Sequence, residues 1–124
     1  LNLLKNYAWC DDWLCTHAGL SNNFFNAYSY PYEEVDEFLG RYSLDGKLEP
    51  RLYNCSPLRG GMDAYGGIVW CDYDEFEPIP GVKQIFGHTA DQVPKRYNNE
   101  NICIDTFLMY YAIYDGSKME IRKV

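Results

Sequence analysis

The second half of the chain carries the hydrophobic patterning of a β-sheet. NICIDT alternates Ile102 and Ile104 with polar neighbours, and VKQIFGH is a short apolar run that follows a Pro-Gly turn. The run YYAIYDGSKMEIRKV divides at Asp-Gly-Ser, a turn sequence between two alternating stretches, and this predicts a β-hairpin. The short segment GGIVW is predicted as a further strand. Together these segments predict a mixed or antiparallel sheet layer from residue 66 onward.

The first half has one strand signal and one helix signal. DWLCTHAG is an apolar run between an acidic pair and a glycine, which predicts a buried strand leading into a loop. In YPYEEVDEFLGRYS, Pro31 suits a first helical position, and Glu33 and Glu34 suit the positive end of the helix dipole. Apolar residues then recur at helical spacing: Val35, Phe38, Leu39 and Tyr42. The pattern predicts a helix over residues 31–41, followed by a loop over 47–64.

Composition fits a single α+β domain and excludes several classes of function. The 124 residues suffice for one core, and an apolar content of 47% argues against disorder. A net charge of −7 with scattered basic residues argues against binding to a nucleic-acid backbone. No apolar stretch approaches bilayer length and no signal-peptide pattern occurs, so we expect a soluble, cytoplasmic protein without a membrane partner.

The cysteines and the acidic run offer little specific chemistry. Five cysteines are an odd number and include no Cys-x-x-Cys pair, so we expect mostly buried thiols in a reducing compartment rather than disulfides. A zinc site formed by Cys10, Cys15 and His17 is an alternative, although its spacing is not that of a zinc finger. The run DYDEFEPIP lacks EF-hand spacing and is predicted to be a solvated loop.

The two histidines are the chief candidates for chemistry. His17 and His88 each end an apolar run, and each precedes a turn of small residues. A sheet holds such a side chain in place while the following loop stays open, and imidazole suits zinc, iron, nickel and manganese. We therefore expect the two rings to lie together at one sheet end, with nitrogens about 3–4 Å apart and able to share one ion. The alternative is that each is an ordinary hydrogen-bonded histidine.

Four strings in order resemble the C-terminal half of the calcineurin-like metallophosphoesterases. They are HAGLS, GGIVWCD, QIFGHT and NICIDT, which run from His17 to Thr106. The likeness is above all to serine/threonine phosphoprotein phosphatases and to phage and bacterial relatives that include diadenosine tetraphosphate hydrolases. The resemblance implies an α+β fold, half of a β-sandwich with a mixed sheet flanked by helices. It also implies hydrolysis of phosphomonoesters of phosphoprotein or nucleotide-type substrates at a centre of two divalent metal ions (Mn, Fe or Zn).

The same resemblance assigns roles to four residues. The histidines of the HAG and GH strings bind the second metal in that family, which makes His17 and His88 the expected metal ligands here. Asp72 matches the acid of the family's Trp-x-Asp string, and Asp105 matches the Ile-Asp-Thr string. Both are expected to support the site without binding the metal. For Asp105, a role in capping a strand end is an equal alternative.

A phosphate-binding arginine is also expected from the resemblance. Arg59, in SPLRGG between the two histidines and beside flexible glycines, is the candidate. Arg51 and Arg96 are alternatives, and so is the possibility that Arg59 is a solvated surface arginine.

The chain also departs from the family pattern. It lacks the Asp-x-His, Gly-Asp-x-x-Asp-Arg-Gly and Gly-Asn-His strings that carry the first metal's ligands, the bridging carboxylate and the general acid in that family. Phe107 stands where the family usually has glycine. We therefore expect residues 1–124 to form a partial domain, inactive alone and completed by an N-terminal half or another chain. The competing interpretation is a non-catalytic, β-rich binding or structural module with incidental histidines.

Overall fold

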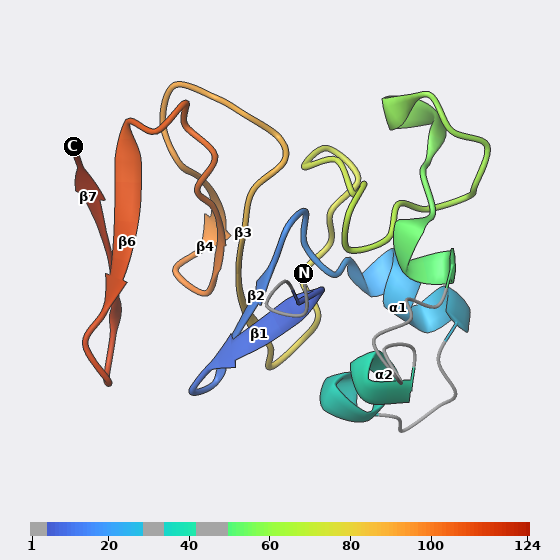
Figure 1. Ribbon diagram of the computed structural model, residues 1–124, viewed down its shortest axis with the longest axis horizontal. Coiled ribbons are helices and arrows are strands. Elements are labelled where there is room, and N and C mark those ends of the chain that lie inside the picture. Colours follow the sequence, from blue (N-terminus) through green and yellow to red (C-terminus); the bar gives the residue numbers. More distant parts are fainter. Residues whose placement is uncertain (1–4, 29–33, 42–49) are drawn as a thin grey trace.

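The computed structural model describes residues 5–28, 34–41 and 50–124, and its centre is a five-stranded mixed sheet (Figure 1). The strands are β1 (Tyr7–Cys10), β2 (Trp13–Thr16), β3 (Lys83–Phe86), β4 (Lys95–Asn98) and β5 (Asn101–Cys103), in the order β1-β2-β3-β5-β4. The pairs β2–β3 and β3–β5 are parallel, whereas β1–β2 and β4–β5 are antiparallel. The α+β class with a mixed sheet is therefore confirmed.

The three parallel strands end at the same edge of the sheet, and this arrangement positions the site. His17 follows β2, Gly87 and His88 follow β3, and Ile104 follows β5. The backbone N–H of Gly87 donates to the carbonyl of His17 at 2.8 Å, and that of Ile104 donates to the carbonyl of Phe86 at 2.8 Å. Parallel strands commonly place ligand-binding residues beyond their carboxyl ends.

The main core lies between the sheet and two short helices, α1 (Asn22–Tyr28) and α2 (Val35–Arg41). Phe38 of α2 contacts Phe24 and Phe25 of α1 edge-on, with ring centroids 6.2 and 5.1 Å apart. The buried members of this core are Leu14, Leu20, Phe24, Phe25, Val35, Phe38, Leu39, Leu52, Ile68 and Ile79. Across the part of the chain that is described, no helix has the length and apolar character needed to cross a bilayer.

A second, smaller cluster lies nearer to the strand ends. It consists of Ala18, Cys71, Phe76, Phe86 and Cys103. All five cysteines are free thiols, as predicted, but two are buried and three are partly exposed. The expectation of mostly buried thiols was therefore wrong for Cys10, Cys15 and Cys55.

The last two strands, β6 (Tyr110–Tyr114) and β7 (Met119–Lys123), form a separate two-stranded antiparallel sheet (Figure 1). The carboxylate of Asp115 closes their turn by accepting hydrogen bonds from the backbone N–H groups of Ser117 (2.8 Å) and Lys118 (2.9 Å). The predicted hairpin is confirmed. Desolvation and the nearby carboxylate of Asp11, in the β1–β2 turn, raise the pKa of Tyr114 to about 12. The β-sandwich of the metallophosphoesterases stays a prediction.

The predicted strand at GGIVW was wrong, because residues 67–71 form a turn. The backbone N–H groups of Trp70 and Cys71 both donate to the carbonyl of Gly67, at 3.1 and 2.9 Å. A side chain at Gly67 would clash with the backbone, since its Cβ would lie 2.3 Å from the carbonyl oxygen of Leu52. Ile68 is fully buried, so the apolar run reflects burial rather than strand pairing.

The predicted helix over residues 31–41 and the predicted loop over residues 47–64 differ from the structure only in detail. The predicted helix begins at Val35, its start at Pro31 and Glu33 lies outside the described residues, and Glu34 precedes the helix. Short 3-10 turns, η2 (Pro50–Tyr53) and η3 (Pro57–Arg59), interrupt the predicted loop, of which residues 47–49 lie outside the described part. Strands β1 and β4 and helix α1 went unpredicted.

Candidate functional site

The two histidines lie against each other at the carboxyl ends of β2 and β3. Nε2 of His17 is 3.0 Å from Nδ1 of His88, and the ring centroids are 4.9 Å apart. Parallel pairing of β2 with β3 brings these residues together although 71 positions separate them in the sequence. The separation agrees with the expected distance of about 3–4 Å between the nitrogens.

His88 is held in an unusual backbone conformation. Its φ is +74°, in the left-handed region that residues other than glycine, asparagine, aspartate and histidine seldom adopt. The tight turn is closed by a 2.9 Å bond from the Thr89 N–H to the Gly87 carbonyl. The ring also contacts Trp70 edge-on, with centroids 5.6 Å apart. A strained residue of this kind persists only where the surrounding structure holds it in place, and such residues are found most often at functional sites.

The surroundings of His88 favour its neutral form. Burial, the neighbouring Arg59 guanidinium and His17 lower the pKa of His88 below its ordinary value, against smaller opposing effects of Asp72 and Asp105. A neutral imidazole is the form that binds a metal ion. Nε2 of His88 is buried and has no hydrogen-bond partner within the described residues, so the ring is only partly satisfied by protein.

The histidine pair fits part of a metal coordination shell. Two nitrogens that each lie about 2.0–2.1 Å from one ion are about 3 Å apart when the angle at the ion is near 90–100°. The observed 3.0 Å suits a shared divalent ion, and it is also the length of a direct hydrogen bond between the two rings, as expected of ordinary hydrogen-bonded histidines. The described residues contain no group of three His, Cys, Asp or Glu side chains placed to hold an ion, so Cys10, Cys15 and His17 do not form a three-ligand site, and the histidine pair is not a complete site by itself. Further ligands would have to come from elsewhere.

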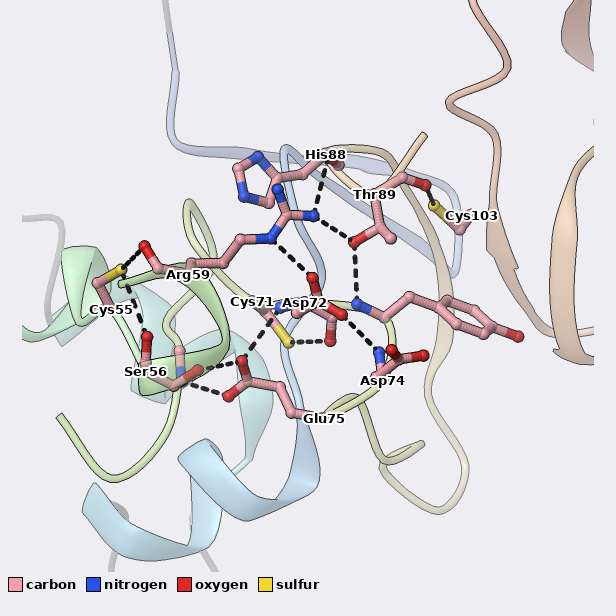
Figure 2. A network of polar contacts seen from close by, with 12 residues as sticks. Cys55, Ser56, Arg59, Cys71, Asp72, Asp74, Glu75, His88, Thr89 and Cys103 are labelled. Atoms are coloured by element: carbon pink, nitrogen blue, oxygen red, sulfur yellow. Dashed lines mark hydrogen bonds and ion pairs between the residues drawn. The ribbon is translucent and has the colours of Figure 1, made fainter. Parts of the chain in front are cut away.

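Arg59 reaches the same site from the end of η3 (Figure 2). Its Nε donates to Oδ2 of Asp72 at 2.7 Å, and its Nη2 donates to Oγ1 of Thr89 at 3.1 Å and to the carbonyl of His88 at 3.4 Å. The side chains of Arg59 and Asp72 are both largely shielded from solvent. Arg59 is thus anchored beside His88 by three protein groups, and it is not a freely solvated arginine.

The other two arginines that the sequence offered lie elsewhere. The guanidinium of Arg51 sits 5.7 Å from the ring centroid of Tyr28. Arg96 is an exposed residue of β4, paired with Ile102 of β5. Among the three candidates, Arg59 is the one that contacts the residues at the end of β3.

A carboxylate that the sequence interpretation missed, that of Glu75, organises the loop that carries Arg59 (Figure 2). Oε2 of Glu75 accepts hydrogen bonds from the Ser56 hydroxyl at 2.6 Å and from the Asp72 N–H at 3.2 Å, and Oε1 accepts from the Gly66 N–H at 2.7 Å. Glu75 belongs to the acidic run predicted as a solvated loop, and that prediction was wrong for this residue. No periodicity marks it, because its partners lie 19, 9 and 3 positions earlier in the chain, without a regular spacing.

Asp72 and Thr89 extend this network toward the histidines. Asp72 binds Arg59 through one oxygen and accepts from the Asp74 N–H through the other, at 2.9 Å. The Thr89 hydroxyl also accepts from the Tyr73 N–H at 2.9 Å, so it joins the β3 turn to the acidic loop. Asp72 therefore holds Arg59, as a supporting residue would. Thr89 carried no distinct signal in the sequence apart from its place next to His88.

A cavity of about 390 Å³ borders both histidines. Asp105 lines it, together with Gly87 and residues of the 108–112 segment, and the Asp105 carbonyl accepts from the Asp91 N–H at 3.0 Å. Phe107, which stands where glycine was expected from the family resemblance, has a φ of +55°, and the next residue, Leu108, has +64°. The backbone thus adopts a glycine-like conformation at this position although the side chain is bulky.

No protein-family model, curated protein or solved structure gave a significant match to the chain. The chemistry of the site is therefore inferred from its own residues: two adjacent imidazoles, an anchored guanidinium and nearby carboxylates. Such a set can bind a divalent cation on one side and an anionic oxygen on the other.

Proposed function

We propose that this chain supplies part of the centre of a metal-dependent phosphoesterase. In this proposal His17 and His88 hold one divalent ion, and Arg59 binds the phosphate of the substrate. The observation that carries the proposal is the 3.0 Å approach of two imidazole nitrogens at the ends of adjacent parallel strands. The lowered pKa of His88 supports it, because the ring is then neutral and able to bind a metal at neutral pH.

The chain's own residues have separate tasks in this proposal. Asp72 and Thr89 hold Nε and Nη2 of Arg59, which orients the plane of the guanidinium. Its remaining N–H donors are then available to phosphoryl oxygens, which arginine binds with high geometric specificity. A bound divalent ion would supply charge stabilisation and activation of water. Glu75 would act indirectly: by accepting hydrogen bonds from Ser56 and Asp72, it fixes the positions of the two segments that flank Arg59.

The substrates we propose are phosphomonoesters of phosphoprotein or nucleotide type. The remaining metal ligands, with the first metal's carboxylates and the general acid, would come from a polypeptide segment outside residues 1–124 or from another chain. The isolated chain is then expected to release little phosphate. The alternative, a non-catalytic β-rich module, is favoured by one observation: the described residues offer the ion no third ligand.

Metal binding tests the proposal directly. Titration of Zn²⁺ and Mn²⁺ into the chain by calorimetry should reveal one site, with affinity lowered at least about tenfold in His17→Ala and in His88→Asn. Asparagine is chosen at position 88 because it tolerates the left-handed backbone. Gln92→Ala, a change at an exposed residue of the loop that follows His88, is the matched control and should bind like the parent chain. Unchanged affinity in both histidine variants would contradict the assignment.

Activity then separates the two alternatives. The chain alone should hydrolyse p-nitrophenyl phosphate poorly with added Mn²⁺, whereas addition of a polypeptide that carries the Asp-x-His and Gly-Asn-His strings should restore turnover. Turnover should fall again when Arg59 is changed to alanine in that mixture, by a factor that corresponds to about 2–4 kcal/mol. Robust turnover by the chain alone would contradict the partial centre, and metal binding without turnover in the mixture would favour the binding module.

A further inference from the structure

The cavity beside the histidines has apolar walls on the side away from the metal ligands. Tyr110 and Ala112 line it from β6, where half-buried residues alternate with the exposed Tyr111 and Ile113. The alternation places Tyr110 and Ala112 on one face of the strand and Tyr111 on the other, and all three residues line the cavity, whereas Ile113 does not. The volume of about 390 Å³ is at the small end of the range for small-molecule sites, which are commonly apolar with a few polar groups.

The rim of this cavity exposes a large apolar side chain. Leu108 is 90% exposed, and its neighbours Phe107 and Met109 are exposed as well. Leu108 is therefore presented to solvent at the mouth of the cavity instead of contributing to the core. A bound apolar group would cover it and gain from the removal of this surface from water.

The turn that presents Leu108 is fixed by hydrogen bonds. Thr106 is 1% exposed, its carbonyl accepts from the Met109 N–H at 3.1 Å, and its hydroxyl accepts from the Tyr110 N–H at 3.0 Å. The Val124 N–H donates to the Met109 carbonyl at 2.9 Å, which ties the turn to the end of β7. These bonds hold Phe107 and Leu108 in two consecutive left-handed conformations. A strained turn held in this way is pre-organised, so it loses little conformational freedom when a ligand binds.

We propose that this cavity receives the leaving group of the phosphoester, and that the leaving group is an alcohol that carries a flat aromatic ring, such as the phenol of an aryl phosphate or the nucleoside of a nucleotide. The inference rests on the proposed function and deepens it. The cavity adjoins both histidines, so a phosphoryl group bound there would direct its leaving group toward Tyr110 and Leu108. An aromatic ring fills a small apolar cavity and packs against a tyrosine ring. The short alkyl group of a serine or threonine ester would leave most of these walls in water.

The inference is tested with leaving groups alone, without phosphate or metal. Phenol and adenosine, titrated into the ¹⁵N-labelled chain, should shift the amide signals of residues 104–112 with dissociation constants of about 1–10 mM. Serine amide and ribose should leave these signals unchanged. Equal shifts by the aromatic and aliphatic probes, or shifts confined to another part of the chain, would overturn the inference.

Three variants locate the binding. Leu108→Ala should weaken phenol binding by at least about threefold, with little effect on folding because the side chain is exposed. Ala112→Leu should also weaken it, because the added atoms would fill the cavity. Ile113→Ala is the matched control on the opposite face of β6 and should bind like the parent chain. Parent-like binding in both Leu108→Ala and Ala112→Leu would overturn the inference.

Failure of the leaving-group assignment can be distinguished from failure of the proposed metal-dependent function. The ring titration involves neither an ion nor a phosphate, so a chain that binds no metal can still bind phenol between Leu108 and Tyr110. A chain that binds metal through His17 and His88 but shows no preference for aromatic probes would refute the leaving-group assignment alone.

Discussion

The two sheets of this protein line the same cavity but are stabilised in different ways. Residues at the ends of β2 and β3 form its histidine wall, and residues of β6 form its apolar wall. In the five-stranded sheet, β5 is buried along its whole length, and Phe86 of β3 packs on Phe76 with ring centroids 4.5 Å apart. In the β6–β7 hairpin, every second residue of β6 is exposed and none of its residues is buried. Core packing therefore holds the histidine wall, whereas hydrogen-bonded turns hold the apolar wall. A two-stranded hairpin has marginal stability by itself, so we expect the β6–β7 hairpin to unfold before the five-stranded sheet.

The largest expected effect is loss of core packing beneath the histidines. Phe86→Ala should lower the free energy of unfolding by about 3–5 kcal/mol, because it empties the buried position one residue before Gly87. Ile113→Ala, in the hairpin, should cost about 1 kcal/mol or less. Urea unfolding followed by fluorescence measures both. Similar losses for the two variants would remove the contrast between the walls.

The next effect concerns the loop that carries Arg59. Glu75→Gln should lower the unfolding free energy by about 1–3 kcal/mol, because the carboxylate accepts hydrogen bonds from three groups and a neutral amide replaces them poorly. Glu77→Gln, in the same acidic run and exposed, is the matched control and should be close to neutral. Thermal unfolding of both variants provides the comparison. If Glu77→Gln costs as much as Glu75→Gln, general charge in the run is responsible rather than the network.

A smaller effect is expected from pH at the histidine wall. The folded pKa of His88 is lowered, chiefly by burial, so the unfolded chain binds its proton more readily. Stability should therefore rise with pH between the lowered folded pKa and the unfolded value of about 6.5, and this increment should be complete above that value. Parent and His88→Asn chains, unfolded in urea at a series of pH values, should differ in slope within this window. Equal slopes would contradict the burial of this ring.

The smallest effect belongs to the hairpin turn. Hydrogen bonds from Lys118 N–H, Ser117 N–H and the Ser117 hydroxyl lower the pKa of Asp115 to about 2. The turn is thus strongest when this carboxylate is charged, and it should weaken as pH falls from about 4 toward 2. In Asp115→Ala, amide hydrogen exchange should accelerate in β6 and β7 and stay unchanged in β2, β3 and β5. Faster exchange throughout both sheets would show that the hairpin and the larger sheet unfold together.

The features that were predicted correctly depend on local pattern. The strand before His17, the strand before His88 and the Asp-Gly-Ser hairpin each carry their signal within a few residues. The closeness of the two histidines followed from placing both at strand ends. GGIVW misled because a buried turn and a buried strand share the same apolar composition.

The features that were missed depend on partners distant in sequence or on weak patterns. The Arg59–Asp72 ion pair spans 13 positions, and the bonds of Glu75 span 19, 9 and 3, so no regular spacing could reveal them. Strand β4 is mostly exposed and polar, and so shows no apolar alternation. Helix α1 is only seven residues long, although Ser21, whose carbonyl accepts from the Phe25 N–H, is a common type of residue at a helix start and could have marked it.

The left-handed backbone at position 88 limits which residues the chain can tolerate there. Glycine, asparagine, aspartate and histidine are the residues that adopt this conformation most readily. Binding of a metal ion through nitrogen requires a different set of residues, of which histidine is the most common. Histidine belongs to both sets, whereas glycine, asparagine and aspartate belong only to the first. Changes to these three residues should therefore keep the fold and remove the imidazole, while most other substitutions at position 88 should strain the backbone and lower stability.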